Sequence, residues 1–486
     1  MRLPPKPRKP DPLEQLLARP AYAEIPITLV PHGLVVPLGV MVRGTREWML
    51  DEPTLEQLFQ EHAPDQYTRE LTLSALVGLL IQVAAGMRAS VQAAYQADPT
   101  ETQPTITTSF QAVYGKLGRL QPAVSEAVVR YSGQRCGQVL DAKPNARNEP
   151  LPGYRMRVLD GNVLAGTHHR LTPLRQWLNA CLPGKSLVVY EPGVGLATDL
   201  VLCEDAYPQE RALLTQLLPR VQANDVFVAD RNFCTVRFVF GVPGRKAFVL
   251  VRQHRRSLPC EPVSRLKYCG KTATGTIYEQ RVRATDLDTG DVLSLRRIEI
   301  RLFAKTRNGD RTLAVLTHLP DDVSAERIAE LYLLRWTIEN HFQYLTQELN
   351  CEQPGRGQPR AALFGFAMAL LAGNAVAVVR SAIRSVHGVE AEAEISGHYL
   401  ADESAHDYRT LMKYLPPDPW LGWSRLSPST LARLLRSLAK HVNLPALTRS
   451  KRGPKKPPKK KPVYNKRHKH YSTARLLKEF RNKGPC

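Results

Sequence analysis

The sequence has 486 residues, of which 43% are hydrophobic, and its formal net charge at pH 7 is +22. This length and apolar content allow a large core, which excludes a wholly disordered, collagen-like or disulfide-framework protein. The excess of positive charge favours a polyanionic partner, most often nucleic acid. The eight Cys residues include no CxxC pair, which disfavours a structural zinc site and fits a reducing cytosol.

The first 150 residues have a mainly helical pattern after a Pro-rich start. Segment 64–97 places its Leu residues on one face at helical spacing, and segment 110–140 forms a second helical stretch. The N-terminal residues lack the apolar run of a secretion signal, so we expect a cytoplasmic protein. Because 142–153 has the composition of a linker, we predict a helical N-terminal domain at 1–150. Lys116, Arg119 and Arg130 of its second helical stretch are candidates for DNA contact, but plain helical packing is the stronger interpretation.

The pattern then changes to short strands separated by a helix. Within 151–250 we expect one amphipathic helix at 208–221 and strands at 154–159, 186–190, 196–203 and 226–229. From about 247 the helical pattern disappears, and we expect strands at 247–251, 275–283, 292–303 and 312–316. Segment 251–319 has no helical pattern, and its β-rich runs are separated by the turn sequences DTGD and RNGD. The sequence therefore predicts an α/β domain interrupted by a β-rich insertion at 251–319.

Helices return in 320–445, at 324–349, 360–386 and 430–442. The stretch 361–379 carries no charge and reaches the length of a membrane span. It is rich in Ala and Gly, contains Asn374 and stands alone. We therefore expect a buried core helix, and no membrane partner.

Most of the net charge lies at the C-terminus. Residues 449–486 contain fifteen Lys and Arg against the single acid Glu479, a net charge of +14. The region holds several Pro and few apolar residues, so it buries too little surface to offset the entropy of ordering. We predict that 446–486 is a flexible basic tail that binds nucleic-acid phosphates without preference for a base sequence. The alternative is a tail that only increases solubility.

Two Asp residues follow strand-like runs. Asp230 comes after Val226–Ala229 in the chain, a run that is apolar on both faces, and Asp160 ends the run YRMRVLD. Ligands of open α/β sheets bind beyond the carboxyl ends of strands, so the pair predicts a shared acidic site. Either Asp alone is more often a turn or helix-capping residue.

Glu339 is the third candidate acid. On a continuous helix from 324, an apolar stripe runs from Leu331 to Leu349, and Tyr332, Arg335 and Glu339 fall on a neighbouring arc. A carboxylate at that edge is partly desolvated and still reaches a substrate. The plain alternative is an i, i+4 ion pair between Arg335 and Glu339, worth about 0.3 to 0.5 kcal/mol.

Three clustered carboxylates suit two divalent ions that activate an attacking oxygen and stabilise a leaving oxygen. Mg²⁺ prefers such hard oxygen ligands. In a basic protein, this arrangement favours cleavage or transfer of a nucleic-acid phosphodiester.

Three short blocks resemble a known family. LDGN at 159–162, ADRNF at 229–233, and Tyr332, Arg335 and Glu339 at the spacing Y-x₂-R-x₃-E are similar to the signature blocks of DDE transposases, specifically the insertion-sequence-four family of bacteria. The resemblance spans about 150–385, with the β-rich insertion between the second and third blocks.

The resemblance implies a ribonuclease-H-like catalytic domain. It implies Asp160, Asp230 and Glu339 as catalytic ligands of two Mg²⁺ ions, with Mn²⁺ as a substitute. It also implies that Tyr332 and Arg335 contact the phosphates of transposon ends. Trp336 and Arg170 are further candidates for DNA contact.

As partners, the resemblance implies double-stranded DNA, both the inverted-repeat ends and the target, and a homodimer in the synaptic complex. It implies that the N-terminal domain at 1–150 recognises the DNA ends, and that the protein lies in a bacterial cytoplasm beside the nucleoid. The implied reaction is cleavage at the element's ends followed by strand transfer.

The chain departs from the family pattern at one position. The signature continues with Lys six residues after the Glu, where this chain has Thr346. A Thr hydroxyl hydrogen-bonds a phosphate but supplies no charge. Thr346 supports one alternative to an active transposase, a transposase-derived DNA-binding protein without catalysis, although the intact Asp160, Asp230 and Glu339 argue against it. A second alternative is a ribonuclease-H-like nuclease that does not join strands.

Overall fold

The computed structural model describes most of the chain in two compact units. The described residues are 36–66, 70–97, 106–143, 149–164, 171, 174, 181–306, 309–351, 357–414, 420, 422–450 and 471–482. A helical unit contains Met1–Arg147, Tyr344–Arg356 and Arg360–Lys469, and a sheet unit contains Asn148–Gln343, Gly357–Pro359 and His470–Cys486. The predicted boundary at 150 lies three residues from the first division.

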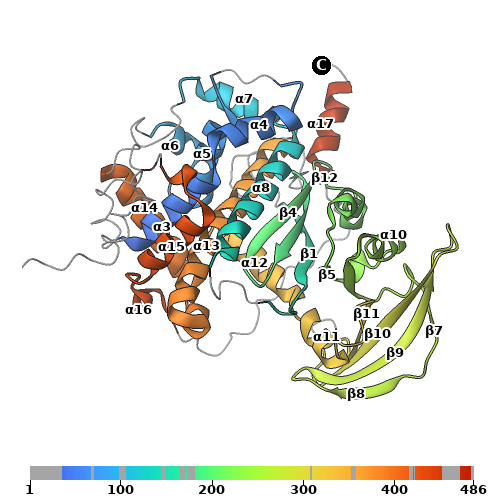
Figure 1. The fold of residues 1–486 in the computed structure, drawn as a ribbon. Coiled ribbons are helices and arrows are strands. Elements are labelled where there is room, and N and C mark those ends of the chain that lie inside the picture. The colour runs from blue at the N-terminus through green and yellow to red at the C-terminus, as the bar shows by residue number, and fades with distance from the viewer. Residues whose placement is uncertain are drawn as a thin grey trace, which may run out of the picture. The chain divides into compact units, whose positions relative to one another are not determined.

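A ten-stranded mixed sheet forms the sheet unit (Figure 1). At one end the order is β4-β3-β1-β5-β6, in which β1 pairs antiparallel with β3 and parallel with β5. Their bounds are β1 Arg155–Val163, β3 Lys185–Glu191, β4 Leu196–Cys203, β5 Asp225–Ala229 and β6 Phe248–Arg252. Each was predicted from its apolar run, and the bounds of β4 agree with the prediction.

The strands of the β-rich insertion continue this sheet. β11 (Thr312–Thr317) pairs with β6, and β10 (Val292–Leu302) and β9 (Gly275–Thr285) follow. β7 (Cys260–Pro262) and β8 (Lys267–Lys271), which the sequence pattern did not predict, both pair with β9. The insertion therefore extends the existing sheet.

Strand β1 corrects one prediction about the acidic residues. Asp160 does not end the strand: β1 continues to Val163, and Asp160 pairs with Val188 of β3. The parallel pairing with β5 stops one residue earlier, at Leu159 and Ala229. Asp160 is thus inside the strand, at the position where its parallel neighbour ends.

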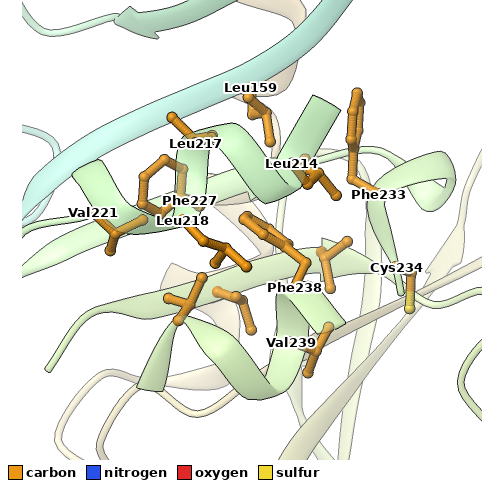
Figure 2. Close-up of a cluster of buried hydrophobic side chains, with 14 of the residues drawn as sticks. Leu159, Leu214, Leu217, Leu218, Val221, Phe227, Phe233, Cys234, Phe238 and Val239 are labelled. Atoms are coloured by element: carbon orange, nitrogen blue, oxygen red, sulfur yellow. The ribbon is translucent and has the colours of Figure 1, made fainter. Parts of the chain in front are cut away.

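One face of the sheet is closed by an apolar core. Figure 2 shows Leu159 and Phe227 of the strands packed with Leu214, Leu217 and Phe238. The predicted helix 208–221 is broken into η3 (Glu210–Leu213), α9 (Leu214–Leu217) and η4 (Leu218–Arg220). The unit also contains η5 (Arg231–Phe233), α10 (Val236–Gly241) and η6 (Pro243–Arg245).

The predicted helix 324–349 is also two helices. α11 (Ala325–Tyr332) begins after Ser324, whose side chain accepts a hydrogen bond from the backbone N–H of Arg327. α12 (Arg335–Gln347) starts three residues after α11 ends. The apolar periodicity continues across the break, which is why the sequence predicted a single helix.

The helical unit is built on amphipathic and wholly apolar helices. The long predicted stretches are divided: 64–97 at Gly86, whose φ is +71°, and 110–140 before Pro122, whose ring starts a new helix. Its helices are α3 Pro37–Met49, α4 Glu52–His62, α5 Leu73–Ala84, α6 Val91–Tyr95, α7 Phe110–Arg119, α8 Pro122–Asp141, α13 Pro359–Ala393, α14 Gly397–Tyr414, η8 Trp423–Arg425, α15 Pro428–Ala439 and α16 Leu444–Leu447.

Helix α13 contains the charge-free stretch 361–379. It is long and apolar enough to cross a membrane, but 94% of its most apolar 18-residue window is buried within the protein. Asn374 is fully buried and donates to the Ser132 hydroxyl at 3.0 Å. Lys143, predicted to lie in a linker, is also buried and donates to the Val378 carbonyl at 3.1 Å. These contacts are those of a core helix.

The C-terminus differs from the predicted flexible tail. β12 (Tyr471–Ser472) pairs in parallel with β2 (Cys181–Leu182), and α17 (Thr473–Asn482) packs through buried Leu476 against Leu174. The prediction is wrong for 471–482, because Leu476, Leu477 and Phe480 pack against Leu171 and Leu174. It is also wrong for 446–450, where Leu447 is buried and the Arg449 N–H donates to the Glu394 carbonyl at 2.9 Å. Residues 451–470, which hold most of the tail's charge, lie outside the described residues.

Candidate active site

Asp160 and Asp230 lie close enough to repel each other. Leu159 faces the apolar core, so Asp160, the next residue of β1, faces the opposite side of the sheet. Asp230 immediately follows β5, whose last residue is level with Leu159. Its Oδ1 accepts the backbone N–H of Asn232 at 2.7 Å, which fixes the side chain at the start of η5. The structure therefore brings Asp160 and Asp230 near each other, and a shared functional site there stays a prediction.

This environment raises the pKa of Asp160 to about 7. Burial is the largest cause, and the negative charge of Asp230 is the next. The backbone N–H of Gly161, which donates to Asp160 Oδ1 at 2.9 Å, and the charge of Arg335 both oppose the shift. A carboxylate placed in this way is costly without a cation beside it.

Helix α12 lies on the same face as Asp160. Val158 pairs with Tyr190 across β1 and β3, and the Tyr190 ring stacks on His341 of α12 with 4.6 Å between ring centroids. His341 is buried and its pKa is lowered to about 4 by that burial, so it packs as a neutral ring. Glu339, the third predicted acid, lies two residues before His341 on α12.

Glu339 is held by Arg335. Arg335 Nη1 donates to Glu339 Oε1 at 2.5 Å, and the Glu339 side chain is 41% exposed. The same guanidinium interacts electrostatically with Asp160 and hydrogen-bonds the Tyr332 hydroxyl. Arg335 therefore interacts with both Glu339 and Asp160. The i, i+4 ion pair between Arg335 and Glu339, which the sequence offered as the plain alternative, is present.

Tyr332 and Trp336 lie on either side of Arg335 in sequence. Tyr332 is buried, which raises the pKa of its hydroxyl to about 12. The charge of Arg252 lowers this pKa and the charge of Asp230 raises it. Trp336 is 53% exposed, and the Arg335 guanidinium lies 4.2 Å from its ring centroid. An Arg backed by an exposed aromatic ring is a surface suited to a phosphate and its nucleoside.

Glu210 is an acid of this region that the sequence analysis missed. It begins η3, its Oε2 accepts from Asn232 Nδ2 at 3.2 Å, and a Cβ built on Gly161 would overlap its carboxyl group. Burial is the largest cause that raises its pKa, and Asp230 contributes. The only hint in the sequence was that Glu210 starts an amphipathic segment.

The described structure does not test the roles predicted for two further residues, Arg170 and Thr346. Arg170 lies outside the described residues. Thr346, at the position of the family Lys, belongs to the helical unit, where its hydroxyl is 3.6 Å from Cys351 Sγ. Their predicted roles remain predictions.

The acids suit a cation, although their grouping is incomplete. Asp160 is largely removed from water and lies near Asp230, and the carboxylate oxygens of both residues are hard ligands of the kind that Mg²⁺ prefers. In the part of the chain that the structure describes, no three His, Cys, Asp or Glu side chains are grouped closely enough to hold a metal ion. Glu339 is instead paired with Arg335. A metal site with all three acids stays a prediction.

Comparisons with known proteins agree with the blocks in the sequence. Residues 153–371, a little under half of the chain, match the family model of the transposase DDE domain, and this segment contains Asp160, Asp230 and Glu339. A solved structure described as a piggyBac transposase synaptic complex with hairpin DNA is similar over 83% of this chain and 81% of its own. Its sequence identity is 13% and its TM-score 0.37, too low to support a conclusion about function. No curated protein matches the sequence.

Proposed function

We propose that this protein is a transposase that cleaves DNA at transposon ends and transfers the strands into target DNA. The observation that carries the proposal is the pairing of Asp160 with Asp230 beside Arg335, inside the segment that matches the transposase DDE domain. The two acids are far apart in the sequence, and the parallel pairing of β1 with β5 brings them near each other.

Asp160, Asp230 and Glu339 are proposed to hold two Mg²⁺ ions, with Mn²⁺ as a substitute. Bound there, the ions supply an activated attacking oxygen and stabilise the leaving oxygen of the phosphodiester. For Glu339 to take part, its carboxylate must leave Arg335, with which it is now paired. The Arg335 guanidinium is then available to a DNA phosphate, to which it offers a planar pair of donors.

The residues around Arg335 fit that role. Tyr332 keeps its proton at neutral pH and holds the guanidinium from the buried side. Trp336 supports it from the exposed side. We propose that these three residues, together with Arg170, contact the DNA near the scissile phosphate.

We propose a ribonuclease-H-like catalytic domain, and the strand order is the observation that supports it. Strands β4, β3 and β1 are antiparallel neighbours, and β5 and β6 continue the sheet in parallel to β1. We propose membership of the insertion-sequence-four family of bacteria. The proposed partners are inverted-repeat ends, target DNA and a second copy of the chain, with the N-terminal helices reading the ends.

The test is cleavage of end DNA. The DNA on both sides of the gene is searched for terminal inverted repeats, and duplexes that carry them are incubated with the protein and Mg²⁺. We expect nicking at the element's end by the wild type and none by Asp230→Ala. Glu261→Ala, which removes an exposed acid of β7, is the control and is expected to nick normally.

Each alternative has its own outcome. Tight binding of the ends without nicking, in Mg²⁺ and in Mn²⁺, identifies a DNA-binding protein without catalysis. Nicking without any joined product identifies a nuclease. Equal nicking by the wild type and Asp230→Ala shows that the acids are wrongly assigned.

A further inference from the structure

Glu210 contacts both the part of β1 that carries Asp160 and the turn after β5 that carries Asp230. Its carboxyl group lies directly against Gly161, the residue after Asp160, at a place that only a residue without Cβ leaves open. The same carboxyl group accepts a hydrogen bond from Asn232 Nδ2 at 3.2 Å. The backbone N–H of Asn232 in turn donates to Asp230 at 2.7 Å. The Glu210 side chain thus contacts Gly161, next to Asp160, and Asn232, whose backbone N–H holds Asp230.

The loop before Glu210 is held in place from several sides. Lys185 Nζ of β3 donates to the Pro208 carbonyl at 2.8 Å. Ala206 N–H donates to Ser472 Oγ at 3.3 Å, and Arg475 Nε donates to Asp205 Oδ2 at 2.7 Å. The Arg475 guanidinium also lies 4.5 Å from the ring centroid of Tyr207. Two of these side chains, Ser472 and Arg475, belong to the C-terminal segment.

The C-terminal segment is itself fixed to the sheet unit. β12 adds to β2, and Leu476 is buried against Leu174, with Leu171, Leu477 and Phe480 around them. Because Ser472 is only 1% exposed, its hydroxyl is an internal contact of the protein. A path of direct contacts therefore runs from α17 through the loop 205–209 to Glu210.

We propose that Glu210 is a positioning residue of the acidic site. It holds the segment of β1 around Asp160 and the turn that carries Asp230 at their working separation, and the C-terminal strand and helix hold Glu210 in place. This inference rests on the proposed function, since it assigns Glu210 a part in the same site.

The first experiment needs no DNA. Hydrogen exchange of the full-length protein is measured for peptides that contain residues 160–164 and 230–235. In Glu210→Ala we expect both to exchange about ten-fold faster, the effect of losing a hydrogen bond to a charged group. Glu210→Gln keeps an acceptor for Asn232 and is expected to stay close to the wild type. Gln209→Ala, an exposed neighbour, and Glu261→Gln, a loss of charge elsewhere, are the controls.

The contacts of the C-terminal segment are tested in the same way. Ser472→Ala and Arg475→Ala each remove one contact to the loop 205–206. We expect faster exchange in the peptide that contains 204–213, and a smaller increase at 160–164. Lys478→Ala, an exposed position of α17, is the matched control and should change neither.

The second experiment measures function. With end DNA and Mg²⁺, Glu210→Ala is expected to lower the single-turnover cleavage rate at saturating DNA about ten-fold, and Glu210→Gln to restore most of it. DNA affinity and melting temperature should stay at the wild-type values, which separates positioning from a general loss of structure. Equal exchange and equal rates in Glu210→Ala and wild type overturn the inference. If the exchange result holds but the wild type cleaves no end DNA, the proposed function fails and the positioning contact stands.

Discussion

Replacing Asp160 by Asn should stabilise the protein without added metal at alkaline pH. The pKa of Asp160 rises from its ordinary 3.8 to about 7, chiefly because the carboxyl group is buried and next because Asp230 is close. The shift is about three units, and each unit corresponds to about 1.4 kcal/mol. Asp160 is partly exposed, so screening by water roughly halves the total, to about 2 kcal/mol.

The sign follows from proton binding. Between pH 3.8 and about 7 the folded protein keeps a proton on Asp160 that the unfolded chain has lost. Stability therefore falls as the pH rises through this window, and the full cost is present above pH of about 7. Asn carries no charge and still accepts from the Gly161 N–H. We expect Asp160→Asn to raise the free energy of unfolding by about 2 kcal/mol at pH of about 8 and by little at pH of about 4.

The assay is hydrogen exchange of amides in β1 and β5 at increasing urea, which reports on the sheet unit itself. Asp225→Asn is the contrasting variant. Asp225 is also buried, but it accepts from Arg157 Nε at 3.2 Å and is 3.0 Å from Arg155, so its loss should destabilise the unit by about 3 kcal/mol. The reasoning is refuted if Asp160→Asn is no more stable than wild type at alkaline pH, or equally stabilising at acid pH.

Three further outcomes are expected. Burial lowers the pKa of Lys143 from 10.5 to about 7. Above pH 7 the unfolded chain therefore binds a proton that the folded protein has lost, and the stability of the wild type rises with pH. In urea unfolding, Lys143→Met should stabilise the protein by about 2 kcal/mol more at pH of about 7 than at pH of about 9. An equal gain in the free energy of unfolding at both pH values would contradict a cost of burying the charged ammonium group of Lys143. A Cβ at Gly44 would overlap the Trp423 ring, so Gly44→Ala should lower the free energy of unfolding by about 2 kcal/mol or more, and an unchanged melting curve would contradict this packing. Arg335→Ala should weaken binding of end DNA by about ten-fold in a gel-shift titration and Arg335→Lys by less, whereas equal affinities would exclude a phosphate contact there.

Apolar runs were the most informative part of the sequence. The strand Leu196–Cys203 was predicted with its observed bounds, and β5 was predicted within one residue of them, because both are nearly continuous apolar runs. β7 and β8 were missed, since they are short and largely exposed and become strands only by pairing with β9. Periodicity cannot show such edge strands.

The site was predicted only in part. Asp160, Asp230 and Glu339 were found through local blocks, but the break before Arg335 was not, because the apolar spacing of α11 continues into α12. Glu210 gave no local signal beyond its place near the start of the predicted amphipathic helix 208–221. Its contact with Gly161 depends on a loop that is held by Ser472 and Arg475, more than 260 residues further along the chain.

Strand transfer tests the central claim most directly. A labelled end duplex that already has a free 3′ hydroxyl is incubated with a supercoiled plasmid, Mg²⁺ and either the wild type, Asp160→Asn, Asp230→Asn or Glu339→Gln. We expect the wild type to join the label covalently to the plasmid and the three variants to lose the joined product while still binding the end. A wild type that never joins the label, or a variant that joins it at the wild-type rate, would contradict the assignment of these acids to DNA transposition.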